Sequence, residues 1–284
     1  MGLVTIISML ATYILASSYT AEPEIAALIV ILVTLILLII GYFVITGFNK
    51  VAEASRMKSE FVAIVSHQLR SPLSVIKWSA EAASREKKQG NSPPAQGHFF
   101  ETVTRTTEYM IRLVNALLEV SRIEANTLVL KKEILSLGEL AQSVIESYRA
   151  YANAANVTLA LDVSPDLPRV EGDRDRVLGV IQNLVDNAIR YSQAGGAVRA
   201  SIKRNGPSLI FKIQDKGVGI PPREQSNVFK KFFRAQNSMK FQTEGTGIGL
   251  YTAKAIVENM GGEIGFESEE GKGSTFWFRL SIKQ

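Results

Sequence analysis

The pattern of hydrophobic and polar positions divides the chain into three parts. Residues 1–49 are almost entirely apolar, and residues 50–126 place apolar side chains at helical spacing. Residues 127–284 alternate between short strand-like and helix-like segments. We therefore predict an α+β chain of three domains with these bounds: a membrane hairpin, a helical domain and an α/β sandwich.

The first part predicts two transmembrane helices with a very short outer loop. Residues 25–49 carry no charge, and residues 25–41 are nearly all aliphatic, which is long enough to cross a hydrocarbon core of about 30 Å. Residues 1–21 are also uncharged and lack the basic start of a signal peptide. We therefore favour a first membrane helix over a cleaved leader.

The charges around these segments predict their orientation. Lys50, Arg56 and Lys58 follow the second span, whereas only Glu22 and Glu24 precede it. Basic residues gather on the cytoplasmic side of membrane helices. The sequence therefore predicts a multi-pass protein of the cell membrane, in contact with lipid, with residues 50–284 in the cytoplasm.

The middle part predicts two long helices separated by a loop. The first ends near Arg85, residues 86–94 are charged and then rich in Gly, Asn and Pro, and the second helix covers residues 96–125. Two amphipathic helices cannot enclose a core alone. We therefore predict a homodimeric four-helix bundle, and an ordinary coiled-coil stalk is the alternative.

The first of these helices carries a histidine opposite its apolar stripe. On a helix, His67 projects about 160° away from the stripe that contains Val65 and Leu69, so it faces outward. A lone histidine is more often a solvated or satisfied residue than a functional one. Pro72 favours a functional role for His67. A proline inside a helix removes a hydrogen bond, bends the chain and costs about 3 kcal/mol, and a bend beside an exposed imidazole can serve to present it. His98 is more simply explained by packing or solvation.

Residues 66–73, SHQLRSPL, resemble the phosphoacceptor box of sensor histidine kinases of two-component signalling. The family pattern is His, acidic, any, Arg, Thr or Ser, Pro, aliphatic. The resemblance implies that His67 is the phosphoacceptor, with Gln68, Arg70 and Ser71 as the catalytic residues beside it. Gln68 stands where the family usually has Glu or Asp, and an amide can hydrogen-bond but cannot act as a base near neutral pH.

The last part predicts helices that pack over a mainly antiparallel sheet. Ser136 and Glu139 form a capping box that opens a helix to about Asn153. Further helices are predicted over residues 173–191 and 246–260. The predicted strands are residues 129–134, 157–163, 198–203, 209–214, 263–267 and 274–282.

Residues 182–191 contain two asparagines one helical turn apart. The amides of Asn183 and Asn187 would share one face, where oxygen atoms can bind Mg²⁺. This segment resembles the N box of the Bergerat-type ATP-binding domain of histidine kinases. The resemblance implies that Asn187 is the metal ligand, Arg190 a phosphate contact and Tyr191 a wall of the nucleotide site.

Two further segments resemble motifs of the same domain. The first follows a predicted strand and contains Asp215, Gly217 and Gly219. A carboxylate can accept a hydrogen bond from an adenine amino group, and glycines let the backbone approach the base and turn sharply. A plain strand-terminating turn is the alternative. Residues 228–234 match the F box, in which Lys231 and Arg234 would offer cations to the phosphates beneath a mobile lid. An ordinary amphipathic helix is the alternative there.

Two glycine-rich segments complete the resemblance. The first opens a predicted helix, where free N–H groups bind anions, and comprises Gly245, Thr246, Gly247, Gly249 and Leu250. Its spacing is G-x-G-x-G and the preceding residues are polar, so a dinucleotide-binding turn is excluded. The second, residues 271–276 with Thr275, matches the last glycine box, although a hairpin turn needs no function.

Composition excludes several other functions. The chain has no cysteine, which excludes disulfides, thiolate metal sites and a cysteine nucleophile, and its two histidines exclude a histidine-rich metal site. The net charge of +5 is spread along the chain without an aromatic-interleaved basic stripe. We therefore expect no direct contact with nucleic acid.

The resemblance implies a function for the whole constellation. ATP would bind as its Mg²⁺ complex, His67 would accept the γ-phosphoryl group, and an aspartate of a response regulator receiver domain would receive it next. We expect a hinge at residues 127–132. A catalytically weak or silent ATP-binding scaffold is the alternative, supported by Gln68. An ATPase of the gyrase or chaperone type is disfavoured, because such enzymes usually carry a catalytic glutamate where Asn183 stands.

Overall fold

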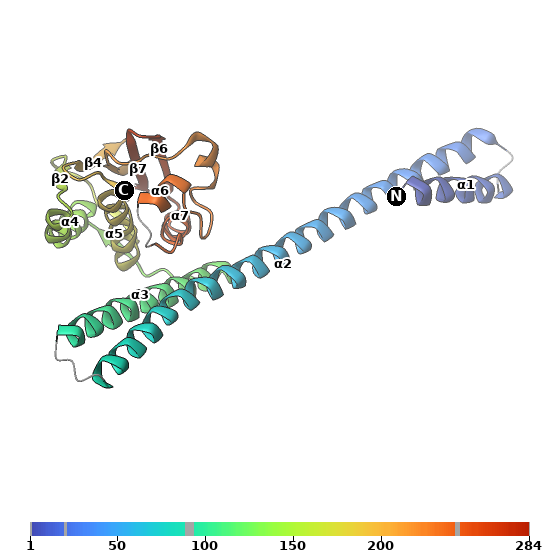
Figure 1. Ribbon diagram of the computed structural model, residues 1–284. Coiled ribbons are helices and arrows are strands. Elements are labelled where there is room, and N and C mark those ends of the chain that lie inside the picture. Colours follow the sequence, from blue (N-terminus) through green and yellow to red (C-terminus); the bar gives the residue numbers. More distant parts are fainter. Residues whose placement is uncertain (1, 20–21, 89–93, 242–244, 284) are drawn as a thin grey trace. The chain divides into compact units, whose positions relative to one another are not determined.

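The computed structural model describes residues 2–19, 22–88, 94–241 and 245–283 (Figure 1). The chain forms two compact units, Met1–Ser71 and Pro72–Gln284. The first unit is helical. The second contains further helix and the whole α/β sandwich.

Two helices begin in the first unit. They are α1, Gly2–Tyr19, and α2, Pro23–Lys88. Within the described residues, Pro23–Asn49 is the one stretch long and apolar enough to cross a membrane, with a mean hydropathy of 3.3, whereas the apolar part of α1 is the shorter Ile6–Ser18. The structure thus contains one candidate span, and the two-span hairpin stays a prediction.

Hydroxyl groups within these apolar helices are satisfied by the backbone. Thr34 Oγ1 donates to the carbonyl of Val30 at 2.7 Å, and Thr46 Oγ1 donates to that of Tyr42 at 2.7 Å. A polar group without a partner would be costly in lipid. These two threonines therefore do not argue against a membrane helix.

The predicted long helices are present, with slightly different bounds. The first extends to Lys88 rather than ending near Arg85, and contains Pro72 within it. The second is α3, Pro94–Glu124, on which Leu113 and Val120 are fully buried. The side chains of His67 and His98 lie outside the described part, so the outward orientation predicted for His67 stays a prediction.

The sandwich is built on a five-stranded sheet in the order β2-β4-β5-β7-β6, in which only β2 and β4 are parallel (Figure 1). A second sheet pairs β1 with β3. The strands are β1 Lys132–Leu135, β2 Thr158–Val163, β3 Val170–Asp173, β4 Ala197–Asn205, β5 Ser208–Gln214, β6 Glu263–Glu269 and β7 Gly273–Ser281. The mainly antiparallel sheet expected from the sequence is confirmed.

Three helices supply the other half of the core. They are α4 Leu137–Ala154, α5 Arg174–Tyr191 and α7 Gly249–Asn259. Their buried aliphatic residues join one cluster with alternate residues of the strands, such as Phe211 and Phe278, whose rings stack 5.3 Å apart. Alternation on the strands is what allows one face of the sheet to be buried.

The caps of α4 and α5 explain where these helices begin. Ser136 Oγ accepts from the N–H of Glu139 at 3.3 Å, as the capping box predicted. Asp173 accepts from the N–H of Arg176 at 3.1 Å and from that of Lys131 at 2.8 Å. Asp173 therefore both starts α5 and holds the segment that leads into the sandwich.

Some elements differ from the predictions. The first strand lies at residues 132–135 rather than 129–134, and α7 begins at Gly249 rather than at Thr246. The sequence did not indicate the four-residue β3, the 3-10 helix η1 Pro222–Asn227 or α6 Gln236–Phe241. Residues 228–232 form turns and bends, Phe232 has a φ of 61°, and residues 233–234 are irregular, so the amphipathic-helix alternative for the F box is wrong.

Candidate nucleotide-binding site

The second unit contains a cavity of about 650 Å³ between α5, α7 and the loops that follow β5 and precede α7. The size is that of a small-molecule site. Most predicted binding residues line it: Asn183, Asn187, Arg190, Tyr191, Asp215, Gly219, Arg234, Gly245, Thr246, Gly247, Gly249 and Leu250. Tertiary structure therefore brings all four nucleotide motifs to one place.

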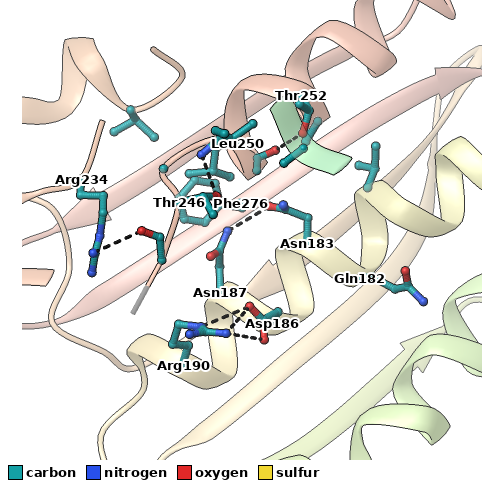
Figure 2. Close-up of a pocket in the computed structure, with 18 of the residues that line it drawn as sticks. Gln182, Asn183, Asp186, Asn187, Arg190, Arg234, Thr246, Leu250, Thr252 and Phe276 are labelled. Atoms are coloured by element: carbon teal, nitrogen blue, oxygen red, sulfur yellow. Dashed lines mark hydrogen bonds and ion pairs between the residues drawn. The ribbon is translucent and has the colours of Figure 1, made fainter. Parts of the chain in front are cut away.

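The α5 wall presents a pair of amides (Figure 2). Asn187 Nδ2 donates to Asn183 Oδ1 at 3.0 Å, which leaves Asn187 Oδ1 as an acceptor. The start of α7 lies directly against this pair: a Cβ added to Gly249 would come within 1.9 Å of Asn183 Nδ2. An amide oxygen held in this way suits a hard cation such as Mg²⁺.

Asp215 is a buried carboxylate at the end of β5. It is 5% exposed and accepts hydrogen bonds from the N–H groups of Gly217, at 2.8 Å, and Ser274, at 3.1 Å. Burial raises the pKa of Asp215 to about 6, although these two backbone hydrogen bonds act in the opposite direction. Near neutral pH the carboxylate can accept a hydrogen bond from an exocyclic amine.

The glycines after Asp215 are required by close backbone contacts. A Cβ on Gly217 would lie 2.1 Å from the carbonyl oxygen of Tyr191, and one on Gly219 would lie 2.0 Å from that of Glu269. Gly219 also has a φ of 60°, which side chains disfavour. Gly217 itself does not line the cavity, so its part is to hold the loop against α5.

The cationic residues are already engaged with other groups. Arg190 forms an ion pair with Asp186 at 3.1 Å (Figure 2). Burial is the largest influence and lowers the pKa of Arg190, but Asp186, Tyr151 and Tyr191 together raise this pKa overall. Arg234 Nη1 donates to the carbonyl of Gly245 at 3.3 Å. Both residues line the cavity.

Lys231 lies outside the cavity lining, in contrast to the position expected for a phosphate contact. Its ammonium group forms an ion pair with Glu124 of α3 and lies 5.2 Å from the centre of the Tyr251 ring. Burial lowers the pKa of Lys231. The turn conformation of residues 228–232, which the sequence did not predict, directs this side chain towards Glu124 of α3.

The glycine-rich loop leads into the N-terminus of α7. Gly247 has a φ of 67°, and a Cβ there would lie 2.6 Å from the backbone of Phe232. Thr246 Oγ1 accepts from the N–H of Ile248 at 3.3 Å, and among the described residues no side-chain capping hydrogen bond forms at the N-cap position, Ile248. The first residues of α7 line the cavity, and the free N–H groups of a helix N-terminus favour anions.

Thr275 does not line this cavity, whereas its neighbours Ser274 and Phe276 do. Side chains alternate along β7, so Thr275 points to the opposite face of the sheet. Alternation was readable in the sequence, but it places Thr275 away from the cavity only once Ser274 or Phe276 is known to face it. Among the other lining residues that sequence reasoning missed are Ile220, Ser238 and Thr252.

Five lining residues come from α3 and were not predicted: Tyr109, Arg112, Asn115, Ala116 and Glu119. Glu119 forms an ion pair with Arg176, which contributes to the same wall. No local pattern in the sequence indicates which face of α3 meets α5. The phosphoacceptor-box residues lie on α2, where Gln68 is half-buried and Arg70 and Ser71 are exposed.

Comparison with known families supports this interpretation. Residues 172–284 match the family described as histidine kinase-, DNA gyrase B- and HSP90-like ATPase. Residues 57–126 match the His Kinase A (phospho-acceptor) domain. The two matches lie in the order that the sequence motifs predicted.

Comparison with individual proteins and solved structures also finds sensory proteins and histidine kinases. Drug sensory protein A of Synechocystis sp. is 34% identical over 242 residues, which is 82% of this chain and 36% of that protein. The structure of the histidine kinase AdeS of Acinetobacter baumannii is 26% identical, with a TM-score of 0.61 over 77% of this chain and 98% of that one. The histidine kinase ThkA in complex with the response regulator protein TrrA has the same fold at 24% identity, with a TM-score of 0.61 over 79% of this chain and 61% of that one.

The chain spans between a quarter and about a third of the length of the curated relatives it matches first. The matched part contains both the phosphoacceptor box and the nucleotide motifs. The chain therefore belongs to the sensor histidine kinase family, with a phosphoacceptor domain followed by an ATP-binding domain.

Proposed function

We propose that the chain is a membrane-bound sensor histidine kinase that phosphorylates His67 from Mg²⁺-ATP and passes the phosphoryl group to an aspartate of a response regulator. The observation that carries the proposal is the cavity of about 650 Å³ at which the four nucleotide motifs meet. The phosphoacceptor box on α2 supplies the acceptor.

The polar groups of the cavity suggest how a nucleotide lies in it. The carboxylate of Asp215 would accept from the adenine amino group, with Gly219 allowing the backbone to approach the base. The phosphates would lie towards the N-terminus of α7 and Arg234. Asn187 would hold Mg²⁺, which when bound neutralises phosphate oxygens.

The transfer step then needs little covalent chemistry from the protein. The unprotonated imidazole nitrogen of His67 forms a bond to the γ-phosphorus as the bond to the bridging oxygen breaks and ADP leaves. The proton on the other imidazole nitrogen is lost to solvent. Because Gln68 cannot take this proton near neutral pH, alignment and charge neutralisation have to supply most of the rate.

The location and the assembly are part of the proposal. Pro23–Asn49 would cross the membrane, α1 would complete a hairpin, and the catalytic part would be cytoplasmic. On α3, Ile111, Val114 and Leu118 are 55%, 42% and 53% exposed in the single chain. A homodimeric four-helix bundle would bury these side chains. The complex of ThkA with TrrA supports a receiver domain as the second partner.

The test is autophosphorylation of the full chain in lipid nanodiscs with γ-labelled ATP and Mg²⁺. We expect acid-labile, base-stable label that is lost in His67→Ala and retained in His98→Ala, the matched control at the second histidine. ATP binding without label would contradict the proposal and favour the catalytically silent scaffold, the alternative that Gln68 supports. Continuous phosphate release that His67→Ala leaves unchanged would indicate an ATPase instead.

A further inference from the structure

Asn237 on α6 is bonded to the loop that follows Asp215. Its side-chain Nδ2 donates to the carbonyl oxygen of Gly219 at 3.0 Å and to that of Val218 at 3.2 Å. One side-chain amide therefore joins two segments, α6 and residues 218–220. Neither the sequence motifs nor the family resemblance assigned a role to this residue.

Further hydrogen bonds of the loop involve the end of α5, where the N–H of Val218 donates to the carbonyl of Tyr191 at 3.3 Å, the β6–β7 hairpin and η1. The N–H of Gly271 donates to the carbonyl of Val218 at 2.8 Å, and the N–H of Ile220 donates to Ser268 Oγ at 2.9 Å. Gln225 Nε2 donates to the carbonyl of Ile220 at 3.1 Å. These hydrogen bonds hold the loop in place, and Asn237 adds a connection to α6, the helix that follows the F box.

Both ends of this connection lie at the cavity. Val218 and Gly219 line it, and so do two buried residues near Asn237 in sequence, Ala235 two positions before it and Ser238 directly after it. Ser238 Oγ donates to the carbonyl of Ala235 at 2.7 Å, which keeps this short segment compact. A displacement of Asn237 would therefore move two parts of the cavity wall relative to one another.

The geometry points to Asn237 as a positioning residue that holds α6 against the base-binding loop, so that nucleotide affinity depends on its amide donor. This inference rests on the proposed function, because it assumes that the cavity binds a nucleotide. Asn237 lies outside the cavity lining and acts through Val218 and Gly219.

The hydrogen bonds indicate that the NH₂ donor of Asn237 contributes more to the position of the loop than the size of its side chain does. Both contacts run from the NH₂ group to carbonyl oxygens, which cannot donate in return. Among the described residues, the buried Oδ1 atom of Asn237 accepts no hydrogen bond. An isosteric carboxylate would place negative charge against two carbonyl oxygens and would repel them.

The experiment compares Asn237→Ala, Asn237→Asp and wild type in the full chain in nanodiscs, with Mg²⁺-ADP titrated by calorimetry. We expect Asn237→Ala to raise the Kd for ADP about fivefold to tenfold, as for the loss of a hydrogen bond, and Asn237→Asp to raise it further. In autophosphorylation, KM for ATP should rise in the same order while kcat stays near wild type. The control is Gln236→Ala, because Gln236 is the exposed neighbour, whose side chain accepts from Arg223 at 3.5 Å.

The order of the ADP affinities of the variants distinguishes a hydrogen-bonding role of Asn237 from a packing role. A packing role predicts that Asn237→Asp, which keeps the shape, resembles wild type and that only Asn237→Ala is impaired, and this order would overturn the inference. Equal ADP affinity in all variants would also overturn it. If wild type binds neither ADP nor ATP, it is the proposed function that fails.

Discussion

Asn187 and Asn183 lie one turn apart on α5, and the amide of the first donates to the oxygen of the second at 3.0 Å. The hydrogen bond fixes which atom of Asn187 is left as an acceptor. The contact of Gly249 with Asn183 then connects the amide pair to the N-terminus of α7. The proposed metal ligand and the proposed phosphate-binding N-terminus of α7 thus belong to one packed arrangement.

Asn187→Ala tests the proposal that Asn187 binds Mg²⁺. Loss of its amide oxygen should raise the Kd for Mg²⁺-ATP by about tenfold or more, while the Kd for ATP in excess EDTA should change little. Calorimetry with and without the chelator measures both values. Asn205→Ala, at an exposed asparagine of β4, is the control. An equal loss with and without Mg²⁺ would argue against metal ligation.

Gly249→Ala tests the contact between α7 and α5. The added Cβ would lie 1.9 Å from Asn183 Nδ2, so we expect a loss of about 1–3 kcal/mol in the free energy of unfolding, together with weaker nucleotide binding. Thermal unfolding of the full chain measures the first effect. Gly179→Ala, in the interior of α5 with no atom within 4 Å of the added Cβ, should instead stabilise by about 0.5–1 kcal/mol. A neutral Gly249→Ala would show that the amide pair can move.

Asp215 predicts opposite pH trends for stability and for binding. Its folded-state pKa of about 6 lies above the ordinary value of 3.8, so the folded state binds the proton more tightly. The stability that this proton contributes is complete below pH 3.8 and is lost as pH rises through 6, about 3 kcal/mol in all. Nucleotide binding needs the ionised carboxylate and should therefore weaken as pH falls through 6.

Asp215→Asn removes this titration. The melting temperature of the variant, measured from pH 4.5 to 8, should fall less steeply with rising pH than that of wild type, and ADP affinity should lose its decline below pH 6. Asp166→Asn, at an exposed position, is the control and should keep both wild-type trends. Parallel pH profiles for wild type and Asp215→Asn would contradict a raised pKa at this site.

Gln68→Glu tests the departure from the family pattern. A carboxylate beside His67 can accept the imidazole proton, so the initial rate of autophosphorylation should rise about tenfold or more. Incorporation of label from γ-labelled ATP gives the rate. Gln142→Glu, an equivalent change at an exposed position of α4, should leave the rate unchanged. An unchanged or lower rate in Gln68→Glu would argue against a base at this position.

The sequence by itself determined the family, a candidate span at residues 25–49, most core helices and strands, and most of the nucleotide-motif residues that line the cavity. These features are local: uncharged apolar length, helical or alternating periodicity, a serine cap at residue 136 and short glycine motifs are all encoded within a few residues. Even the side-chain direction of Thr275 follows from alternation along its strand, once the face of a neighbouring residue is known.

Only the tertiary structure decided the partners of the charged groups and the contacts between distant segments. Lys231 pairs with Glu124, and Asn237 reaches the carbonyls of residues 218 and 219, because chain segments far apart in sequence are packed together. The raised pKa of Asp215 has the same origin, since desolvation depends on every segment that covers the carboxylate. Such interactions have no local period or composition by which a sequence could reveal them.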